Sequence, residues 1–66
     1  MNIKINGEIK VLDQKINLAD LIKNLGLSCD KVVTEYNSRI VSVKERETLV
    51  LEEDGNLEII SFVGGG

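Results

Sequence analysis

Two short runs at the start of the chain alternate polar and apolar residues, which predicts β-strands over residues 2–6 and 8–12. Between them, Asn6 and Gly7 predict a tight hairpin turn, because both residues tolerate the positive φ that such a turn requires. We expect the apolar residues of both strands to point into the core: Ile3, Ile5, Ile9 and Val11.

The spacing then changes to one that predicts a short helix. Apolar residues at i, i+3, i+4 and i+7 form one helical stripe: Leu18, Leu21, Ile22 and Leu25. Asn17 is suited to the N-cap, because its side-chain oxygen can accept a hydrogen bond from the first helical turn. Gly26 can adopt the left-handed conformation that ends a helix. Because a helix of about two turns is unstable alone, we expect it to pack on a sheet.

Residues 31–36 and 39–43 predict two further strands, joined by a turn at Asn37 and Ser38. Both faces of the first of these strands carry an apolar residue, so the pattern leaves open which face meets the core. The two alternatives for the inward set are Val32, Thr34 and Tyr36, or Val33 and Glu35.

The last part of the chain alternates polar turns with apolar segments. Residues 44–48 are a charged run that predicts a solvated turn or a single helical turn, and residues 49–51 return to the core. Asp54 and Gly55 lie at the centre of an acidic turn. Residues 57–63 then predict the last strand.

This order of elements predicts an α+β fold, with a mixed sheet of four to five strands and one helix on one face. If Leu57 and Ile59 face the helix, the residues between and after them face the other way. Apolar patches often mark protein interfaces, so we expect this face to dock partner proteins. The expected docking residues are Glu58, Ile60, Phe62 and Val63. In the alternative interpretation, Phe62 folds over the sheet edge and completes the core.

The chain ends on three glycines, Gly64, Gly65 and Gly66. Glycine loses more conformational freedom on ordering than any other residue, so we expect a domain over residues 1–63 and a flexible tail over residues 64–66. The tail offers one functional group, the α-carboxylate of Gly66, which is ionised at neutral pH. A partner enzyme could admit this thin thread into a narrow channel, although an incidental disordered terminus is the alternative.

Composition limits what the chain can do by itself. Its 66 residues include two aromatic residues and no histidine, so we expect a small aliphatic core without room for an internal active site or cofactor. The lone cysteine, Cys29, excludes an internal disulfide and has no partner for a zinc site. We therefore expect a protein that is not an enzyme. A net charge of −3 does not favour a nucleic-acid partner, and no apolar run suits a membrane, so we expect a cytoplasmic protein.

The chain resembles the ubiquitin-like, β-grasp sulfur carriers of the ThiS family over essentially its whole length. The resemblance is carried by the Ile3/Ile5 strand with its Asn6-Gly7 turn, the helix, Tyr36-Asn37, Ile40-Val41, the Asp54-Gly55 turn and, above all, residues 59–66. Departures from the usual pattern fall in turns and a loop, at Ser38, Ser42 and Asn56.

The resemblance implies a cycle of reactions at Gly66 in the synthesis of the thiamine thiazole. An E1-like adenylyltransferase (ThiF type) would use ATP to form a transient acyl-adenylate, and sulfur from a donor protein would replace AMP to give a thiocarboxylate. The carrier would then dock on a thiazole synthase (ThiG type) and deliver the sulfur. It would bind no stable cofactor, and the chain has no P-loop motif of its own.

Three alternatives remain at this point. Another thiocarboxylate carrier, such as a molybdopterin-synthase small subunit or a carrier for cysteine synthesis, would share the fold and the glycine end. A ubiquitin-like modifier would instead be joined to lysines. A small interaction domain would need no glycine tail. The sequence leaves the pathway, the docking surface and the oligomeric state open.

Overall fold

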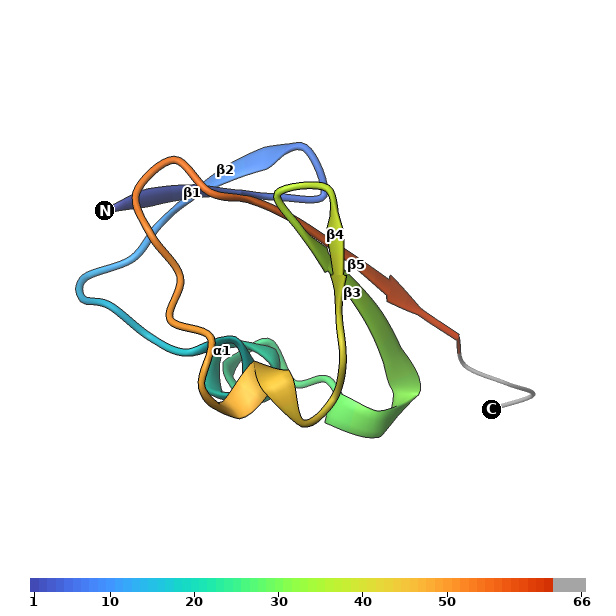
Figure 1. Cartoon of the computed structure of the whole chain (residues 1–66). Helices are drawn as coiled ribbons and strands as arrows, with labels where there is room; N and C mark the ends of the chain where they lie inside the picture. The colour runs from blue at the N-terminus through green and yellow to red at the C-terminus, as the bar shows by residue number, and fades with distance from the viewer. Residues whose placement is uncertain (63–66) are drawn as a thin grey trace.

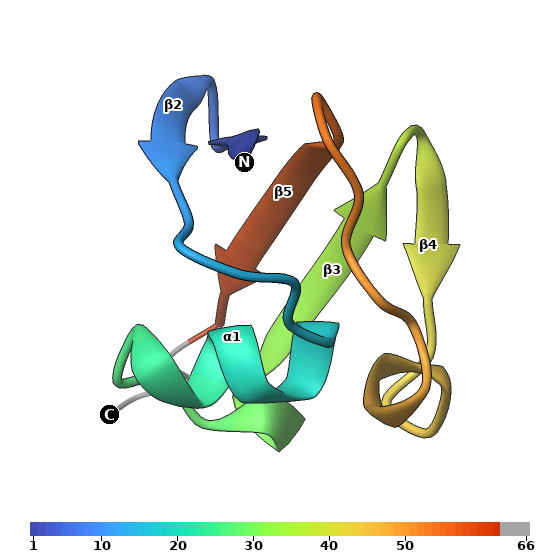
Figure 2. The same ribbon diagram turned by 90° about the vertical axis from the view of Figure 1, so that its left-hand side faces the viewer.

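The computed structural model describes residues 1–62, which form one five-stranded sheet with a single α-helix across one of its faces (Figures 1 and 2). The helix is α1 (Leu18–Asn24), and two short 3₁₀ turns are η1 (Cys29–Lys31) and η2 (Glu45–Glu47). The strands are β1 (Asn2–Ile5), β2 (Glu8–Val11), β3 (Val32–Tyr36), β4 (Arg39–Val41) and β5 (Asn56–Ser61).

The last strand lies in the middle of the sheet, whose strand order is β2-β1-β5-β3-β4. β5 runs parallel to β1 and antiparallel to β3, and the two outer pairs are antiparallel hairpins. The last strand thus lies directly beside the first. Because β1 and β5 run in the same direction, the end of β5 points away from the N-terminus (Figure 1).

The core fills the layer between α1 and the sheet. Its residues come from α1, from every strand except β2 and from the segment before β5, and the fully buried ones include Ile3, Leu18, Ile22, Val41, Leu51 and Leu57. Val32, Thr34 and Tyr36 are buried, so the inward face of β3, which the pattern left open, is the face with these three residues.

Local signals located the turns and the helix correctly. Asn6 and Gly7 both have positive φ, and so do Asn37 and Ser38 in the second hairpin. At the start of α1, Asp20 N donates a 2.7 Å hydrogen bond to Asn17 Oδ1, which makes Asn17 the N-cap. Past its end, Gly26 has a φ of +78°.

The expected inward direction of Ile9 and Val11 is wrong, because these side chains are 65% and 73% exposed. The two-residue turn pairs Ile5 with Glu8 and Lys4 with Ile9. Directly paired residues share a face of the sheet, so Ile9 follows Lys4 outward while Ile5 points inward.

Two further residues expected in the core are partly exposed. Leu25 caps the helix beyond its last full turn, where the sheet no longer covers it. Val50 lies in an extended segment that pairs with Asn17, and there the side chains alternate, so Leu51 is buried and Val50 is not. The fourth strand also stops at Val41, before the expected residue 43.

The charged run at 44–48 forms a single helical turn, but one of its residues is not solvated. Arg46 is 3% exposed, and its guanidinium donates to Thr34 Oγ1 at 3.1 Å, to the carbonyl of Val32 at 2.8 Å and to the carbonyl of Cys29. Cys29 itself is half-buried. Arg46 thus ties η2 to the start of β3, because a buried cation needs hydrogen-bond acceptors.

Replacing Arg46 by alanine should lower the free energy of unfolding by about 2–4 kcal/mol, because it leaves buried carbonyl groups without donors. Urea denaturation monitored by circular dichroism would measure this loss. Arg39→Ala is the matched control: Arg39 pairs with Glu45 on the exposed surface, where solvent screens the pair, so its loss should lower the free energy of unfolding much less. Equal losses for the two variants would contradict a special role for Arg46.

Candidate functional site

The end of β5, which leads into the C-terminal tail, is hydrogen-bonded to β3 on one side. β3 pairs with β5 as far as Val32 and Ser61, and Phe62 N then donates to the carbonyl of Lys31 at 3.2 Å. Four predicted site residues lie outside the described residues: Val63, Gly64, Gly65 and Gly66. The structure therefore gives the attachment point of the predicted carrier group.

On its other side, β5 is completed by the side chain of Asn6 where β1 ends. Asn6 Oδ1 accepts a 2.7 Å hydrogen bond from Ile59 N, and Asn6 Nδ2 donates to the carbonyl of Ile59 at 3.1 Å. The side-chain amide thus takes the place of a strand residue and pairs with the backbone of β5 at Ile59. Sequence reasoning assigned Asn6 only to the turn, because no local signal reveals a contact with residue 59.

The face of the sheet opposite α1, here called the outer face, carries two of the predicted docking residues, Glu58 and Ile60. Leu57 and Ile59 are buried, whereas Ile60 and Phe62 are 63% and 52% exposed. The predicted alternation along β5 is therefore confirmed, and the alternative in which Phe62 completes the core is wrong. Glu58 is half-buried on the same outer face as Ile60.

Sequence reasoning missed two apolar neighbours of this patch. Val33 of β3 lies directly opposite Ile60, and Ile40 of β4 is exposed in the next strand. Together with Glu35 and Glu58, these residues line a hollow of about 140 Å³ in the outer face. The hairpin register could have suggested Val33 and Ile40 once the inward face of β3 was known.

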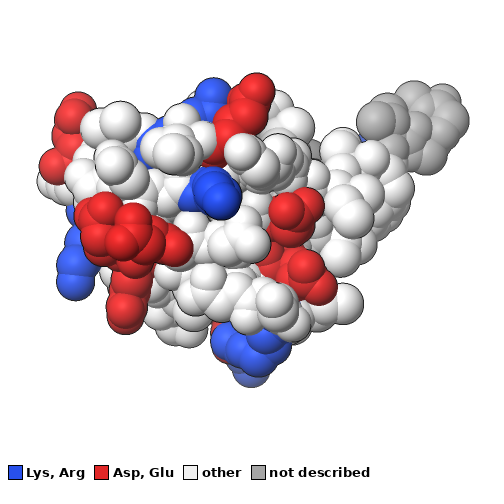
Figure 3. Space-filling view, turned by 90° about the horizontal axis from the view of Figure 1, so that it is seen from above, with Lys and Arg blue, Asp and Glu red and all other residues white. Residues whose placement is uncertain are grey.

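Glu35 and Glu58 form a like-charge pair in this hollow, because they are directly opposite each other in the β3–β5 register. The ion pairs within residues 1–62 join Lys10 with Glu8 and Arg39 with Glu45, so neither carboxylate of the like-charge pair has a cationic partner there. Figure 3 shows acidic groups beside the uncharged surface that extends toward the end of the chain.

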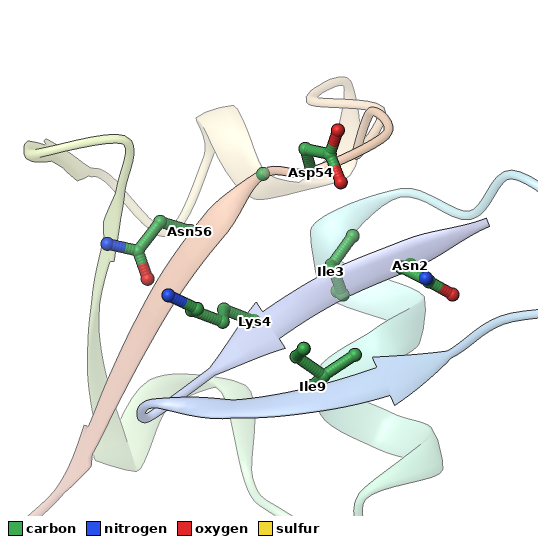
Figure 4. Close-up of a pocket in the computed structure, with 7 residues that line it drawn as sticks. Asn2, Ile3, Lys4, Ile9, Asp54 and Asn56 are labelled. Carbon is green, nitrogen blue, oxygen red and sulfur yellow. The ribbon is translucent and has the colours of Figure 1, made fainter.

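A larger hollow of about 310 Å³ lies on the β1–β2 side of the sheet (Figure 4). Lys4 and Ile9 border it from the strands, and Asp54 and Asn56 border it from the turn and the start of β5. Because β5 begins here and ends at the opposite side, this hollow is remote from the attachment point of the tail.

Among the described residues, two carboxyls have lowered pKa values, and no cluster suits a metal ion. Residues 1–62 contain no group of three or more metal-ligating side chains. The pKa of Asp30 is lowered mainly because Ser28 Oγ donates to its carboxylate, and the pKa of Glu45 is lowered mainly because Arg39 donates to it. Neither carboxyl lies in the outer-face hollow. No helix within residues 1–62 has the length and apolar character needed to cross a membrane.

The comparisons with known proteins agree with this architecture. A family model described as the ThiS family matches residues 3–66. The thiamine biosynthesis protein ThiS from Geobacter metallireducens has a crystal structure with a TM-score of 0.85 to this chain at 23% sequence identity, with both chains fully covered. This likeness confirms the β-grasp fold.

Relatives with higher identity are of two kinds. A thiazole synthase from Magnetococcus marinus is 36% identical over all of this chain, and the uncharacterized protein ycf40 from Trieres chinensis is 34% identical over 94% of it. The chain spans 20% of the length of that thiazole synthase and 85% of the length of the ycf40 protein.

The carboxylates of Glu35 and Glu58 should repel each other, so Glu35→Gln or Glu58→Gln should raise the free energy of unfolding by about 0.2–1 kcal/mol. Thermal and urea unfolding at low ionic strength would measure the gain, and added salt should reduce it because salt screens the repulsion. Glu47→Gln, which removes the same charge from η2, should leave stability nearly unchanged. A loss of stability in both outer-face variants would contradict the repulsion.

Proposed function

The chain belongs to the ThiS family, and from this membership we propose that it is a sulfur carrier for synthesis of the thiamine thiazole. The observation that carries the proposal is the extent of the family match, which continues through residue 66 and so includes the three terminal glycines. The carboxylate of Gly66 is the group that carries sulfur, and Gly64 and Gly65 form the thin thread that delivers it.

The chemistry follows from the weakness of a carboxylate as an electrophile. An oxygen of the Gly66 carboxylate attacks the α-phosphate of ATP, and pyrophosphate leaves. A hydrosulfide ion from the sulfur donor then attacks the carbonyl carbon of the acyl-adenylate, AMP leaves with the electrons of the broken bond, and the new thioacid loses its proton. The product is a C-terminal thiocarboxylate, which transfers its sulfur to the thiazole precursor.

Partner proteins supply the machinery for these steps. An E1-like adenylyltransferase of the ThiF type binds ATP, a sulfur-donor protein provides sulfur, and a thiazole synthase of the ThiG type consumes it. The name of the Magnetococcus marinus relative supports the last partner, since that thiazole synthase contains a segment similar to this whole chain. We place the protein in the cytoplasm, where a lone free cysteine is ordinary.

The described domain serves as a handle for the tail. β3 pairs with β5 as far as Ser61, and Phe62 N donates to the carbonyl of Lys31, so the last described residues of the chain are held against β3. A partner that docks on the outer face therefore receives the tail at a defined place. The proposed docking residues are Glu58, Ile60, Phe62 and Val63.

Ile60→Asp or Phe62→Ala should slow adenylation of Gly66 by about tenfold or more at limiting carrier, because exposed apolar anchors contribute much of the affinity at interfaces. Pyrophosphate release with purified adenylyltransferase would measure the rate. Ile9→Asp is the matched control, because Ile9 is equally exposed on the outer face but lies on β2. Unchanged rates in both docking variants, with the fold intact, would contradict docking through these residues.

Incubating the chain with ATP, a sulfur source and lysate from its host should increase its intact mass by the difference between sulfur and oxygen. Mass spectrometry of the whole chain would detect this change, and deletion of Gly66 should abolish it. Lysine-linked adducts without a sulfur shift would instead support a ubiquitin-like modifier. The absence of any mass change would contradict a functional role for the glycine tail.

A further inference from the structure

The outer-face hollow combines an apolar lining with two carboxylates of like charge. Val33, Ile40 and Ile60 supply the apolar lining, and Glu35 and Glu58 lie opposite each other across β3 and β5. Both glutamates are half-buried. Lys4, the cation of β1 on this face, makes no ion pair within residues 1–62.

A partner that covers this hollow removes water from both carboxylates and must replace the lost hydrogen bonds. Carboxylates that lose water without gaining a cation or hydrogen bonds are strongly unfavourable. An entirely apolar partner surface would therefore bind poorly here, even though three of the five lining residues are apolar. Charge complementarity favours a partner that presents a positive side chain at the centre of the contact.

Arginine fits this position better than lysine does. Its planar guanidinium has several donors in a fixed geometry, so it can bind two carboxylates at once. Its aliphatic stem can pack against apolar neighbours such as Ile40 and Ile60 while the charged group reaches the glutamates. The hollow of about 140 Å³ gives room for a side chain to enter.

We propose that the thiazole synthase partner inserts an arginine side chain into this hollow, where it binds Glu35 and Glu58. This inference rests on the proposed function and adds the chemistry of the partner surface to it. The like-charge pair is then a recognition feature: its repulsion in the free carrier is relieved when the arginine binds. The carrier therefore distinguishes a partner with a central cation from one with an apolar or acidic surface.

Binding of the unmodified whole chain to the thiazole synthase of the same organism tests this inference. Calorimetry at low and high salt would compare the wild type with Glu35→Gln, Glu58→Gln and the double variant. Each single variant should bind about tenfold more weakly, and the double variant should bind only slightly more weakly than either, because both residues contact one side chain. The salt dependence of the affinity should fall in all three variants.

Glu47→Gln is the matched control and should bind like the wild type, since η2 lies against α1 rather than on the outer face. Individual Arg→Ala variants of the synthase surface would complete the test. One of them should weaken binding of the wild-type carrier about tenfold and should have little further effect with Glu58→Gln, as expected when the two residues are in contact.

Several results would overturn the inference. If both glutamine variants bind like the wild type while Ile60→Asp does not bind, the partner uses the apolar residues without a central cation. If the wild type gains a thiocarboxylate but does not bind the synthase, this inference fails while sulfur carriage stands. Conversely, weakened glutamine variants in a protein that never gains a thiocarboxylate would support the docking chemistry and overturn the proposed function.

Discussion

The pairing of β5 with both β1 and β3 is the constraint on which the rest of the structure depends. It joins the last strand to the first in a parallel arrangement, which an ordinary tight turn cannot connect. The chain must therefore pass across one face of the sheet, and α1 does so while it buries Leu18 and Ile22. Because of this pairing, the end of β5 lies inside the sheet, and the residues that lead into the tail begin beside the outer face, which no helix covers.

Because side chains alternate along β5, the residues that stabilise the core and the residues proposed to bind partners lie on opposite faces of the strand. Leu57 and Ile59 belong to the core, whereas Ile60 is exposed on the outer face and Phe62 is exposed just beyond the end of the strand. Changes on the outer face can therefore alter partner binding without opening the core. The exposed apolar residues and the Glu35–Glu58 repulsion do not stabilise the free domain, and conflicts of this kind are typical of functional surfaces.

The buried guanidinium of Arg46 shows a different use of charge. It lies inside the protein without an acidic partner and is satisfied by a hydroxyl and two backbone carbonyls. Through Val32 and Cys29 it holds the beginning of β3, whose other side pairs with the end of β5. An element far along the chain thus supports the segment from which the tail departs.

The sequence by itself determined the features that depend on neighbouring residues: the two hairpin turns, the Asn17 cap, the alternation along β5 and the resemblance carried by the glycine end. Only the tertiary structure decided which face of β3 is inward, that Ile9 and Val11 point outward, that Asn6 completes β5, and that Arg46 is buried. These outcomes depend on where one helix covers a five-stranded sheet and on contacts between residues far apart in the chain. The local pattern shows how apolar and polar residues alternate along a segment. Whether a side chain is buried depends on which other elements cover that face of the sheet.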